Sequence, residues 1–218
     1  MTKITLIDYE MGNIFNVFKA FEMLGCDVVL TKNYNEILNA DRLVLPGVGS
    51  FENGMNNLKK YHTDEIIKEY LVKDRPLLGI CVGMQLMMTR SYENGVHNGL
   101  NLIKGDVVRF DHSVKNKNIK IPQIGWNHLN ISEKHIDFDN KENNLITKNL
   151  KAKPYMYFLH SYYVKPKNKD ISIAYTTYGK NTFCSIFKKN NIIGFQFHPE
   201  RSADQGLILL KNFTKIKL

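Results

Sequence analysis

The sequence has 218 residues, of which 43% are hydrophobic and 23% are charged. This length and apolar content predict one globular domain over residues 1–218, because single domains usually contain roughly 100–200 residues. No apolar run approaches the ~20 residues that a membrane-spanning helix requires. We therefore expect a protein that does not act in a membrane.

Cysteine usage and charge narrow the expected environment. The start MTKITLIDYE places an acid where an export signal would carry its apolar stretch, and Cys26, Cys81 and Cys184 form no disulfide pattern. We therefore expect a cytoplasmic protein. The net charge of +9 is compatible with a nucleic acid, a membrane or an acidic protein partner. Because aromatic residues are not interleaved with the lysines, the charge favours solvated loops or an acidic partner protein over nucleic acid.

Strand and helix patterns alternate in the first part of the chain. Strands are predicted over residues 3–8, 27–31, 42–45 and 77–80. Helices are predicted over residues 64–72 and from Asn13, as the N-terminal cap, to Gly25, which ends the helix. This alternation is typical of a doubly wound α/β fold, in which helices cover both faces of a mostly parallel sheet.

Strand patterns dominate after about residue 100. They cover residues 103–110, 155–159, 171–177, 183–187 and 192–197. A last helix is predicted over roughly residues 203–216. We therefore expect additional antiparallel strands in the second half of the same domain.

The strongest chemical signal is Gly79-Ile80-Cys81-Val82-Gly83, which follows a predicted buried strand and precedes a helix pattern. With serine at the centre, this spacing forms a nucleophile elbow, a sharp turn that exposes the central side chain. The N-terminal end of the following helix would favour a thiolate at Cys81. The alternative, a buried structural cysteine, is common, but the position directly after a core strand favours a nucleophile.

A histidine and a carboxylate lie at the end of another predicted strand. His198 ends the strand pattern, and Glu200 follows it across a turn that contains Pro199. The imidazole could act as the base for Cys81, and Glu200 could orient the ring. A lone histidine at a strand end is usually structural, but its combination with a nucleophile elbow favours a catalytic role.

The loop Leu45-Pro46-Gly47-Val48-Gly49 follows a third predicted strand. Its two glycines would allow backbone amides to turn toward a substrate. Such amides can stabilise the oxyanion of an acyl-transfer intermediate by about 3 kcal/mol for each donor. A Gly-x-Gly pair alone is also typical of an ordinary turn, so this signal depends on the other two.

Together these motifs resemble those of the class I glutamine amidotransferases. The shared segments are PGVGSF at residues 46–51, GICVGMQ at 79–85 and QFHPE at 196–200. More narrowly, the chain resembles the glutaminase subunits of imidazole glycerol phosphate synthase, with further matches at residues 8–13, 125–127 and 158–162. The resemblance spans essentially the whole chain.

The resemblance implies the chemistry. Cys81 would attack the side-chain amide of L-glutamine and form a glutamyl thioester, His198 would shuttle protons, and Glu200 would orient the imidazole. Backbone amides and side chains would complete the oxyanion and substrate site; these belong to Gly47, Val48, Gly49, Val82, Gln85, Ser161 and Tyr162. No cofactor is implied, and the histidines outside the motifs lack metal-ligand spacing, so no metal is expected.

The resemblance also implies a heterodimer with a cyclase subunit. Ammonia would pass to that cyclase, which makes imidazole glycerol phosphate and an aminoimidazole carboxamide ribotide in histidine biosynthesis. A loop at residues 46–49 that presents its amides only in the complex would explain activation by the partner. The residues expected at the partner interface are Gln123, Trp126, Asn127 and Arg201.

Two departures from the family pattern leave alternatives open. Gln123 stands where the family usually has histidine, and Arg201 stands where lysine is usual. A paralogous glutaminase that feeds ammonia to another synthase, such as a sugar-amidinating enzyme, is one alternative. An inactive regulatory subunit of the same fold is another, although Cys81, His198 and Glu200 are all present.

Overall fold

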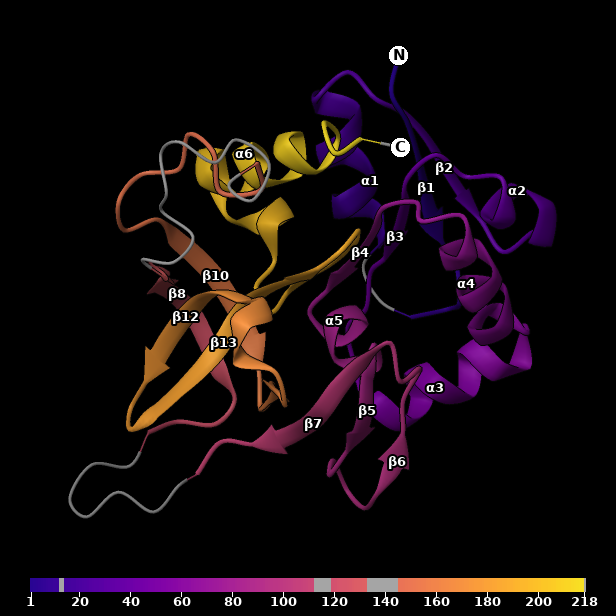
Figure 1. Ribbon diagram of the computed structural model, residues 1–218. Coiled ribbons are helices and arrows are strands. Elements are labelled where there is room, and N and C mark those ends of the chain that lie inside the picture. The colour runs from indigo at the N-terminus through magenta and orange to yellow at the C-terminus, as the bar shows by residue number, and fades with distance from the viewer. Residues whose placement is uncertain (12–13, 112–118, 133–144, 218) are drawn as a thin grey trace.

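The computed structural model describes residues 1–11, 14–111, 119–132 and 145–217 (Figure 1). The helix cap expected at Asn13 lies outside the described residues. Within the described part of the chain, no helix is long and apolar enough to cross a membrane.

A parallel sheet forms the centre of the first half of the chain. Five neighbouring strands run parallel in the order β2-β1-β3-β4-β14. They are β2 (Asp27–Thr31), β1 (Lys3–Ile7), β3 (Leu43–Leu45), β4 (Leu77–Ile80) and β14 (Ile192–Phe195). The last of these comes from the C-terminal part of the chain, so β14 brings distant residues beside β4.

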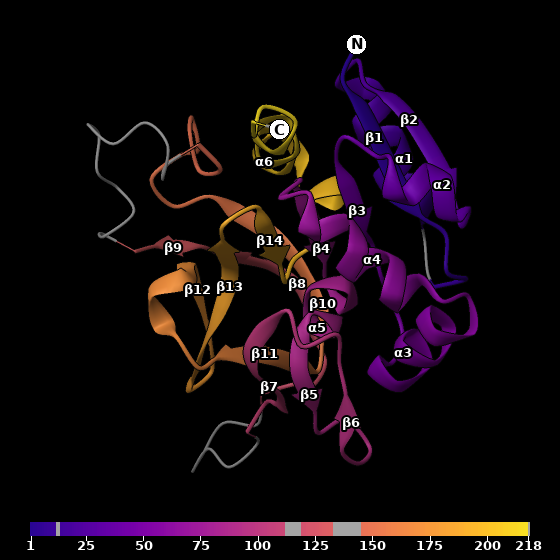
Figure 2. The same ribbon diagram turned by 45° about the vertical axis from the view of Figure 1, so that its right-hand side comes forward.

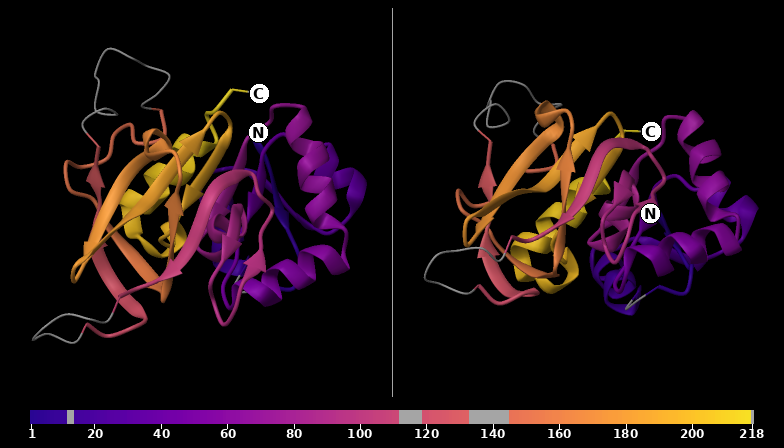
Figure 3. Two further views of the ribbon diagram at one scale, coloured as in Figure 1. Left: turned by 60° about the horizontal axis from the view of Figure 1, so that its bottom comes forward. Right: turned by 90° about the horizontal axis from the view of Figure 1, so that it is seen from below.

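The same sheet continues with antiparallel strands. Beyond β14 the order is β13 (Asn181–Lys189), β12 (Ser172–Tyr178) and β9 (Asn130–Ile131). Two smaller sheets complete the described strands (Figure 3). One pairs β10 (Tyr155–His160) with β8 (Gln123–His128), and the other has the order β11 (Tyr162–Pro166), β7 (Ile103–Arg109), β5 (Met88–Ser91) and β6 (His97–Asn98).

Helices cover both faces of the parallel strands. In Figures 1 and 2, α1 (Ile14–Met23) and α6 (Ala203–Phe213) lie on the opposite side of β3 and β4 from α3 (Phe51–Lys60) and α5 (Val82–Leu86). The remaining helices are α2 (Tyr34–Leu38), α4 (Thr63–Val72) and the short 3-10 turns η2 (Lys169–Ile171) and η3 (Pro199–Arg201).

The spacing of apolar residues explains how α1 packs. Ile14, Val17 and Phe21 follow helical spacing and are buried, and the ring of Phe21 lies 6.4 Å from that of Phe213 on α6. Gly25, with a φ of 76°, follows the helix in the left-handed conformation that glycine adopts at little cost. This confirms the expected amphipathic helix.

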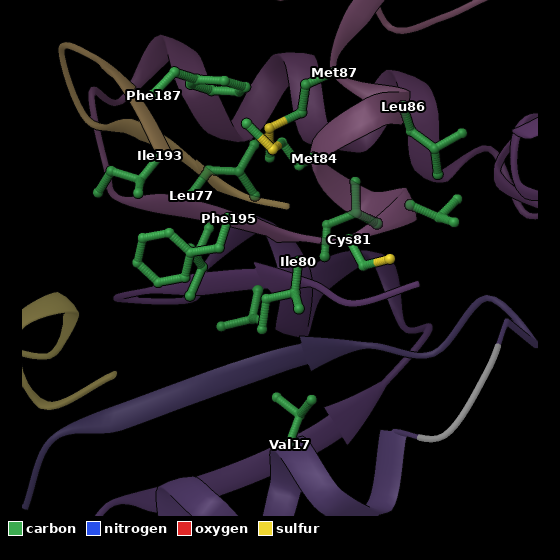
Figure 4. Packing of buried hydrophobic residues seen from close by; sticks show 14 of the residues in the cluster. Val17, Leu77, Ile80, Cys81, Met84, Leu86, Met87, Phe187, Ile193 and Phe195 are labelled. Atoms are coloured by element: carbon green, nitrogen blue, oxygen red, sulfur yellow. The ribbon is translucent and has the colours of Figure 1, made fainter. Parts of the chain in front are cut away.

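Buried apolar side chains surround the turn between β4 and α5. Figure 4 shows Leu77, Met84, Ile193 and Phe195 packed together, with the sulfur of Cys81 pointing away from this cluster. The apolar residues of β4 are completely or almost completely buried, as the continuous run Leu77–Ile80 predicts for a central parallel strand. The core therefore holds Cys81 at its edge.

The architecture confirms the predicted fold class: a mostly parallel sheet lies between helices, and antiparallel strands extend it. No pattern in the sequence predicted α2, α3, β5, β6, β8, β9 or β11. The predicted strand over residues 192–197 ends earlier, at Phe195, and the predicted last helix ends at Phe213.

Candidate active site

The backbone at Cys81 has the geometry of a nucleophile elbow. Its φ is 53° and its ψ is −111°, a conformation that costs a non-glycine residue about 1–3 kcal/mol. The glycines on both sides make the turn possible. A Cβ atom at Gly83 would collide with the carbonyl oxygen of Leu45, and one at Gly79 would lie 2.8 Å from the carbonyl oxygen of Gly83. The following helix, α5, has only five residues, so its dipole acts on Cys81 over a short length.

Strand pairing brings His198 to Cys81. The parallel register of β14 and β4 sets Phe195 beside Ile80, and the amide of Cys81 donates a hydrogen bond of 2.7 Å to the carbonyl oxygen of Phe195. The carboxyl ends of these neighbouring strands therefore carry the thiol and the imidazole at one edge of the sheet.

The backbone of His198 is held on both sides. Its amide donates to the carbonyl oxygen of Tyr157 at 2.9 Å, and its own carbonyl oxygen accepts from the hydroxyl of Ser202 at 2.6 Å. Its Nδ1 atom lies 2.8 Å from Oε1 of Glu200, and both side chains are buried. Because a carboxylate only accepts, Nδ1 carries the proton of this hydrogen bond, and Nε2 is the ring nitrogen that Glu200 does not engage.

The charges at the site keep His198 protonated. Burial lowers the pKa of His198, but the Cys81 thiolate and the Glu200 carboxylate, through charge and hydrogen bonding, outweigh burial and raise it to about 10. Nε2 of His198 is buried and makes no hydrogen bond of standard geometry with any described residue. The charged imidazole of His198 therefore lies beside the sulfur of Cys81 and can deliver a proton.

The loop expected to form the oxyanion site lies against the elbow. The amide of Val82 donates to the carbonyl oxygen of Gly47 at 3.2 Å. The hydroxyl of Tyr9, which is fully buried, donates to the carbonyl oxygen of Pro46. Burial, followed by the charge of Cys81, raises the pKa of Tyr9, so the phenol stays a donor. In this conformation the carbonyl oxygen of Gly47 engages the amide of Val82, so that amide is not available as a donor to a ligand.

A cavity of about 210 Å³ opens beside Cys81. This volume is below the roughly 300–1,000 Å³ of pockets that hold drug-sized ligands, so it suits a small metabolite. Its walls include the expected residues Val48, Gly49, Cys81, Val82, Gln85, Ser161 and Tyr162. The other wall residues were not predicted from the sequence. They are Glu93, Pro122, Leu159 and His160.

Three residues expected in the site, Gly47, His198 and Glu200, do not line this cavity. His198 and Glu200 line a separate small space together with Gly47 and Val48. The sulfur of Cys81 lies 3.7 Å from the carbonyl oxygen of Leu159, on the wall of the larger cavity. The sulfur of Cys81 therefore faces the cavity, while His198 approaches it from the segment that follows β14.

Glu93 supplies a carboxylate to the cavity wall. Its Oε2 atom accepts a hydrogen bond of 2.6 Å from the amide of Phe51, the first residue of α3. Glu93 thus links the cavity to the end of the loop at residues 46–50. It lies in a turn without a recognisable motif, so no pattern in a single sequence singles it out.

His160 is a second residue that the sequence did not select. Burial lowers its pKa to about 3, although its hydrogen bond to the carbonyl oxygen of Tyr162 acts in the opposite direction. That bond is 2.9 Å long and uses Nδ1, so the neutral ring presents Nε2 as an acceptor. Only its place in the segment FLHSY could have drawn attention to it.

Four residues were expected at a partner interface, and they differ in how far they are exposed to solvent. Trp126 is 46% exposed, Asn127 is half-buried, and Arg201 is exposed with its guanidinium 4.2 Å from the centre of the Tyr157 ring. The expectation that Gln123 lies on the surface is wrong, because it is only 2% exposed. Gln123 occupies an inward-facing position of β8, directly opposite His160 of β10.

The acidic, histidine and cysteine side chains of the site do not converge as metal ligands would. No group of three or more His, Cys, Asp or Glu side chains that could hold a metal ion occurs among the described residues. What the described geometry offers for chemistry is the thiol of Cys81 with His198 and Glu200 beside it.

Comparison with known proteins gives a consistent result. The model of the family described as "Glutamine amidotransferase class-I" matches residues 5–216. The imidazole glycerol phosphate synthase subunit HisH of Geobacter sulfurreducens is 42% identical over 219 residues, which cover 100% of both chains. The subunit HisH 1 of Campylobacter jejuni is 43% identical and covers 98% of this chain and 100% of its own.

Solved structures share the fold at lower identity. The structure of PurLQS from Thermotoga maritima has a TM-score of 0.66 at 14% identity, and the match covers 97% of this chain and 96% of that one. A glutamine amidotransferase of the same organism has a TM-score of 0.59 at 16% identity, with coverage of 97% and 90%.

Proposed function

Because the chain belongs to the class I glutamine amidotransferase family, and within it to the HisH subunits of imidazole glycerol phosphate synthase, we propose that it is the glutaminase subunit of that synthase. It hydrolyses L-glutamine to glutamate and ammonia. A cyclase subunit receives the ammonia and makes imidazole glycerol phosphate and an aminoimidazole carboxamide ribotide in histidine biosynthesis. The observation that carries this proposal is the strained Cys81 beside the buried pair of His198 and Glu200.

The geometry supports a two-step acyl transfer. The Cys81 thiolate attacks the side-chain carbonyl carbon of glutamine, and the imidazolium of His198 gives its proton to the leaving nitrogen, so ammonia departs and a thioester remains. Neutral His198 then takes a proton from water as the water attacks the thioester. Glutamate leaves, and the thiolate and imidazolium are restored. Glu200 stabilises the imidazolium in both steps through the 2.8 Å contact.

Substrate polarity matches the cavity walls. The carboxylate of Glu93 and the amide of Gln85 provide polar groups for the charged end of an amino acid, and Ser161 and Tyr162 lie on the same wall. The side-chain amide of the substrate then reaches Cys81. This arrangement favours L-glutamine over an apolar acyl substrate.

Activation by a partner follows from the loop conformation. The carbonyl oxygen of Gly47 accepts the amide of Val82 at 3.2 Å, so an oxyanion has no access to that donor until the loop shifts. We expect the cyclase to stabilise the shifted loop, which would raise glutamine turnover by making oxyanion donors available.

Exposed aromatic side chains supply a surface for the cyclase. Ile124 and Trp126 of β8 are 61% and 46% exposed, and Trp126 stacks on Tyr155 of β10 with ring centres 6.2 Å apart. Arg201 on Tyr157 adds a positive charge beside them. We call Ile124, Trp126, Tyr155 and Arg201 the aromatic surface. A patch of this kind on a protein surface marks an interaction site, and its charge suits an acidic residue of the cyclase.

We also propose that the enzyme acts in the cytoplasm. Cys26, Cys81 and Cys184 are all free thiols, as a reducing compartment maintains them, and the proposed substrate and partner are those of intracellular biosynthesis.

The alternative functions predict different partners. A paralogue that serves sugar amidination would release ammonia to another synthase. The departure at Gln123 no longer favours that alternative, because its buried side chain makes no surface for a partner. An inactive regulatory subunit would not need the strained backbone at Cys81.

Partner specificity tests the proposed function. Glutamate release would be measured with the histidine-pathway cyclase of the same genome, with a nucleotide ligand of that cyclase, and separately with a sugar-amidinating synthase. We expect strong stimulation by the cyclase alone. Stimulation only by the second synthase would assign the paralogous function, and no release with either would support an inactive subunit.

A further inference from the structure

A chain of hydrogen-bonded groups connects the segment after β14, which carries His198, to the cavity. Gln196 lies two residues before His198 and is fully buried. Its Oε1 atom accepts from Nε2 of Gln85 at 3.2 Å. The same Nε2 donates to the carbonyl oxygen of Tyr162 at 2.8 Å. Both protons of the Gln85 amide are therefore engaged, one by Gln196 and one by Tyr162.

These contacts determine which way the Gln85 amide faces. A backbone carbonyl can only accept, so the oxygen of Tyr162 requires the NH2 group of Gln85. If Gln196 were turned by half a rotation, two NH2 groups would face each other. In the observed arrangement the Oε1 atom of Gln85 points away from both Gln196 and Tyr162. Gln85 lies on the cavity wall. The cavity therefore receives the oxygen of Gln85 and not its NH2 group.

We propose that Gln196 is a positioning residue that acts through Gln85 and makes the cavity selective for an α-ammonium group. By accepting one proton of the Gln85 amide, Gln196 keeps the Oε1 atom of Gln85 available as an acceptor. The Oε1 atom of Gln85 and the carboxylate of Glu93 then present two acceptors to a cationic donor. This inference rests on the proposed function, because the ligand is taken to be an amino acid.

Packing of the core does not explain why the buried residue at position 196 is polar. The rings of Phe195 and Phe197 on either side of it are buried and lie 5.3 Å apart. Its own Nε2 atom is buried without a hydrogen-bonding partner among the described residues. An unpartnered buried amide is unfavourable for folding, and an apolar side chain of the same length would avoid it. A role in orienting Gln85 explains why an amide stands at this position.

The test replaces Gln196 by an apolar residue of similar length and compares the binding of ligands with and without an α-ammonium group. Gln196→Met would be assayed in the complex with the cyclase. The measurements are kcat and KM for L-glutamine and the inhibition constants of L-glutamate and of glutarate, which lacks the ammonium group. We expect KM and the constant for L-glutamate to rise about 10–100-fold, since a hydrogen bond to a charged group is lost. The constant for glutarate and kcat should stay within about threefold of the wild-type values, since neither depends on that bond.

A matched control separates positioning from a general loss of structure. Asn212 is another buried amide, which donates to the carbonyl oxygens of Ile146 and Lys148 away from the cavity. In Asn212→Leu, stability should fall while the ratio of the glutarate and L-glutamate constants stays unchanged. If Gln196→Met does not fold, Gln196→Leu provides the same comparison.

Two results would overturn the inference. In the first, Gln196→Met weakens glutarate and L-glutamate equally; in the second, it weakens neither. A wild-type complex that binds L-glutamate but releases none from glutamine would instead contradict the proposed function, while the ratio of the two inhibition constants would still decide the role of Gln196.

Discussion

The Nδ1 atom of His198 lies 2.8 Å from Oε1 of Glu200, and the two side chains are only 5% and 4% exposed. This pair fixes the ring through Nδ1 and leaves Nε2 as the atom that we propose exchanges protons with Cys81. Because the carboxylate is buried with the imidazole, it acts on the proton of His198 with little screening by water. The pair thereby sets both the orientation and the charge of the base.

The first prediction concerns the protonation of His198. In the wild-type protein its pKa should be about 10, and it should fall in Glu200→Gln and in Cys81→Ala, because each change removes a negative charge that stabilises the imidazolium. Titration of the imidazole by NMR measures this. His160 should show no titration in the same experiment down to pH 4, because its pKa is about 3.

The sign of the linked stability change follows. The raised pKa of His198 means that the folded protein holds this proton more tightly than the unfolded chain. The resulting stabilisation is fully present below pH 6.5, the ordinary pKa of histidine, and disappears as the pH rises from 6.5 to about 10. The stability difference between wild type and Glu200→Gln should therefore shrink over that range in urea unfolding. A wild-type His198 that titrates near 6.5 would contradict the charge assignment.

A second prediction concerns the loop. Tyr9→Phe removes the hydroxyl that holds the carbonyl oxygen of Pro46 and should cost about 1–2 kcal/mol of stability. It should also raise glutamine turnover in the absence of the cyclase severalfold, because the loop is freed to leave the amide of Val82. Glutamate release by the isolated protein measures this.

Tyr70→Phe is the matched control for Tyr9→Phe. The Tyr70 hydroxyl donates to the carbonyl oxygen of Pro76 at 2.8 Å, outside the active site. The control should lose similar stability without a change in turnover. Equal turnover in wild type and Tyr9→Phe, with or without the cyclase, would show that this contact does not restrain the loop.

A third prediction compares two glycines under the same substitution. In Gly83→Ala the new Cβ meets the carbonyl oxygen of Leu45, so the free energy of unfolding should fall by more than about 4 kcal/mol. In Gly25→Ala the Cβ meets nothing within 4 Å, and only the φ of 76° opposes it, at a cost of about 1 kcal/mol. Urea unfolding measures both changes. Equal losses would mean that the elbow is not packed as described.

A fourth prediction tests the aromatic surface. Trp126→Ala should weaken binding of the cyclase by about 2 kcal/mol or more, because central exposed aromatics dominate interface energies. Tyr34→Ala is the control: Tyr34 is also 46% exposed, but it lies on α2, across the molecule from β8 (Figure 1). Calorimetric titration with the cyclase measures both. Equal affinities of the two variants would place the interface elsewhere.

The sequence predicted the elements whose apolar pattern is simple. The strands at residues 27–31 and 77–80 have the bounds expected, because short runs of apolar and β-branched residues are typical of strands. Only β4 is buried throughout, since β2 lies at the edge of the sheet. Helix α3 was missed, since FENGMNNLKK contains glycine and three asparagines. The structure shows that Ser50 caps it and that Phe51, Met55 and Leu58 bury one face. Here tertiary packing outweighs weak helix propensity.

The candidate triad could be selected from sequence because each residue lies in a motif at a strand end. The conformation of the loop at residues 46–49 could not be predicted from sequence, since it depends on the hydrogen bond between Val82 and Gly47. Nor could the burial of Gln123, because β8 was not recognised as a strand and its alternation was not used. The contacts of Glu93 and Gln196 reach across the fold, so the sequence does not predict them, although Gln196 belongs to the QFHPE segment.

The most direct test of the account is release of glutamate from L-glutamine by the complex with the cyclase, in wild type, Cys81→Ala and Cys184→Ala. Cys184 is a buried thiol of the core and serves as the control. We predict strong stimulation by the cyclase in wild type and Cys184→Ala, and a loss of at least about a thousandfold in Cys81→Ala. Undiminished, cyclase-stimulated turnover in Cys81→Ala would contradict the assignment of the nucleophile and with it the proposed mechanism.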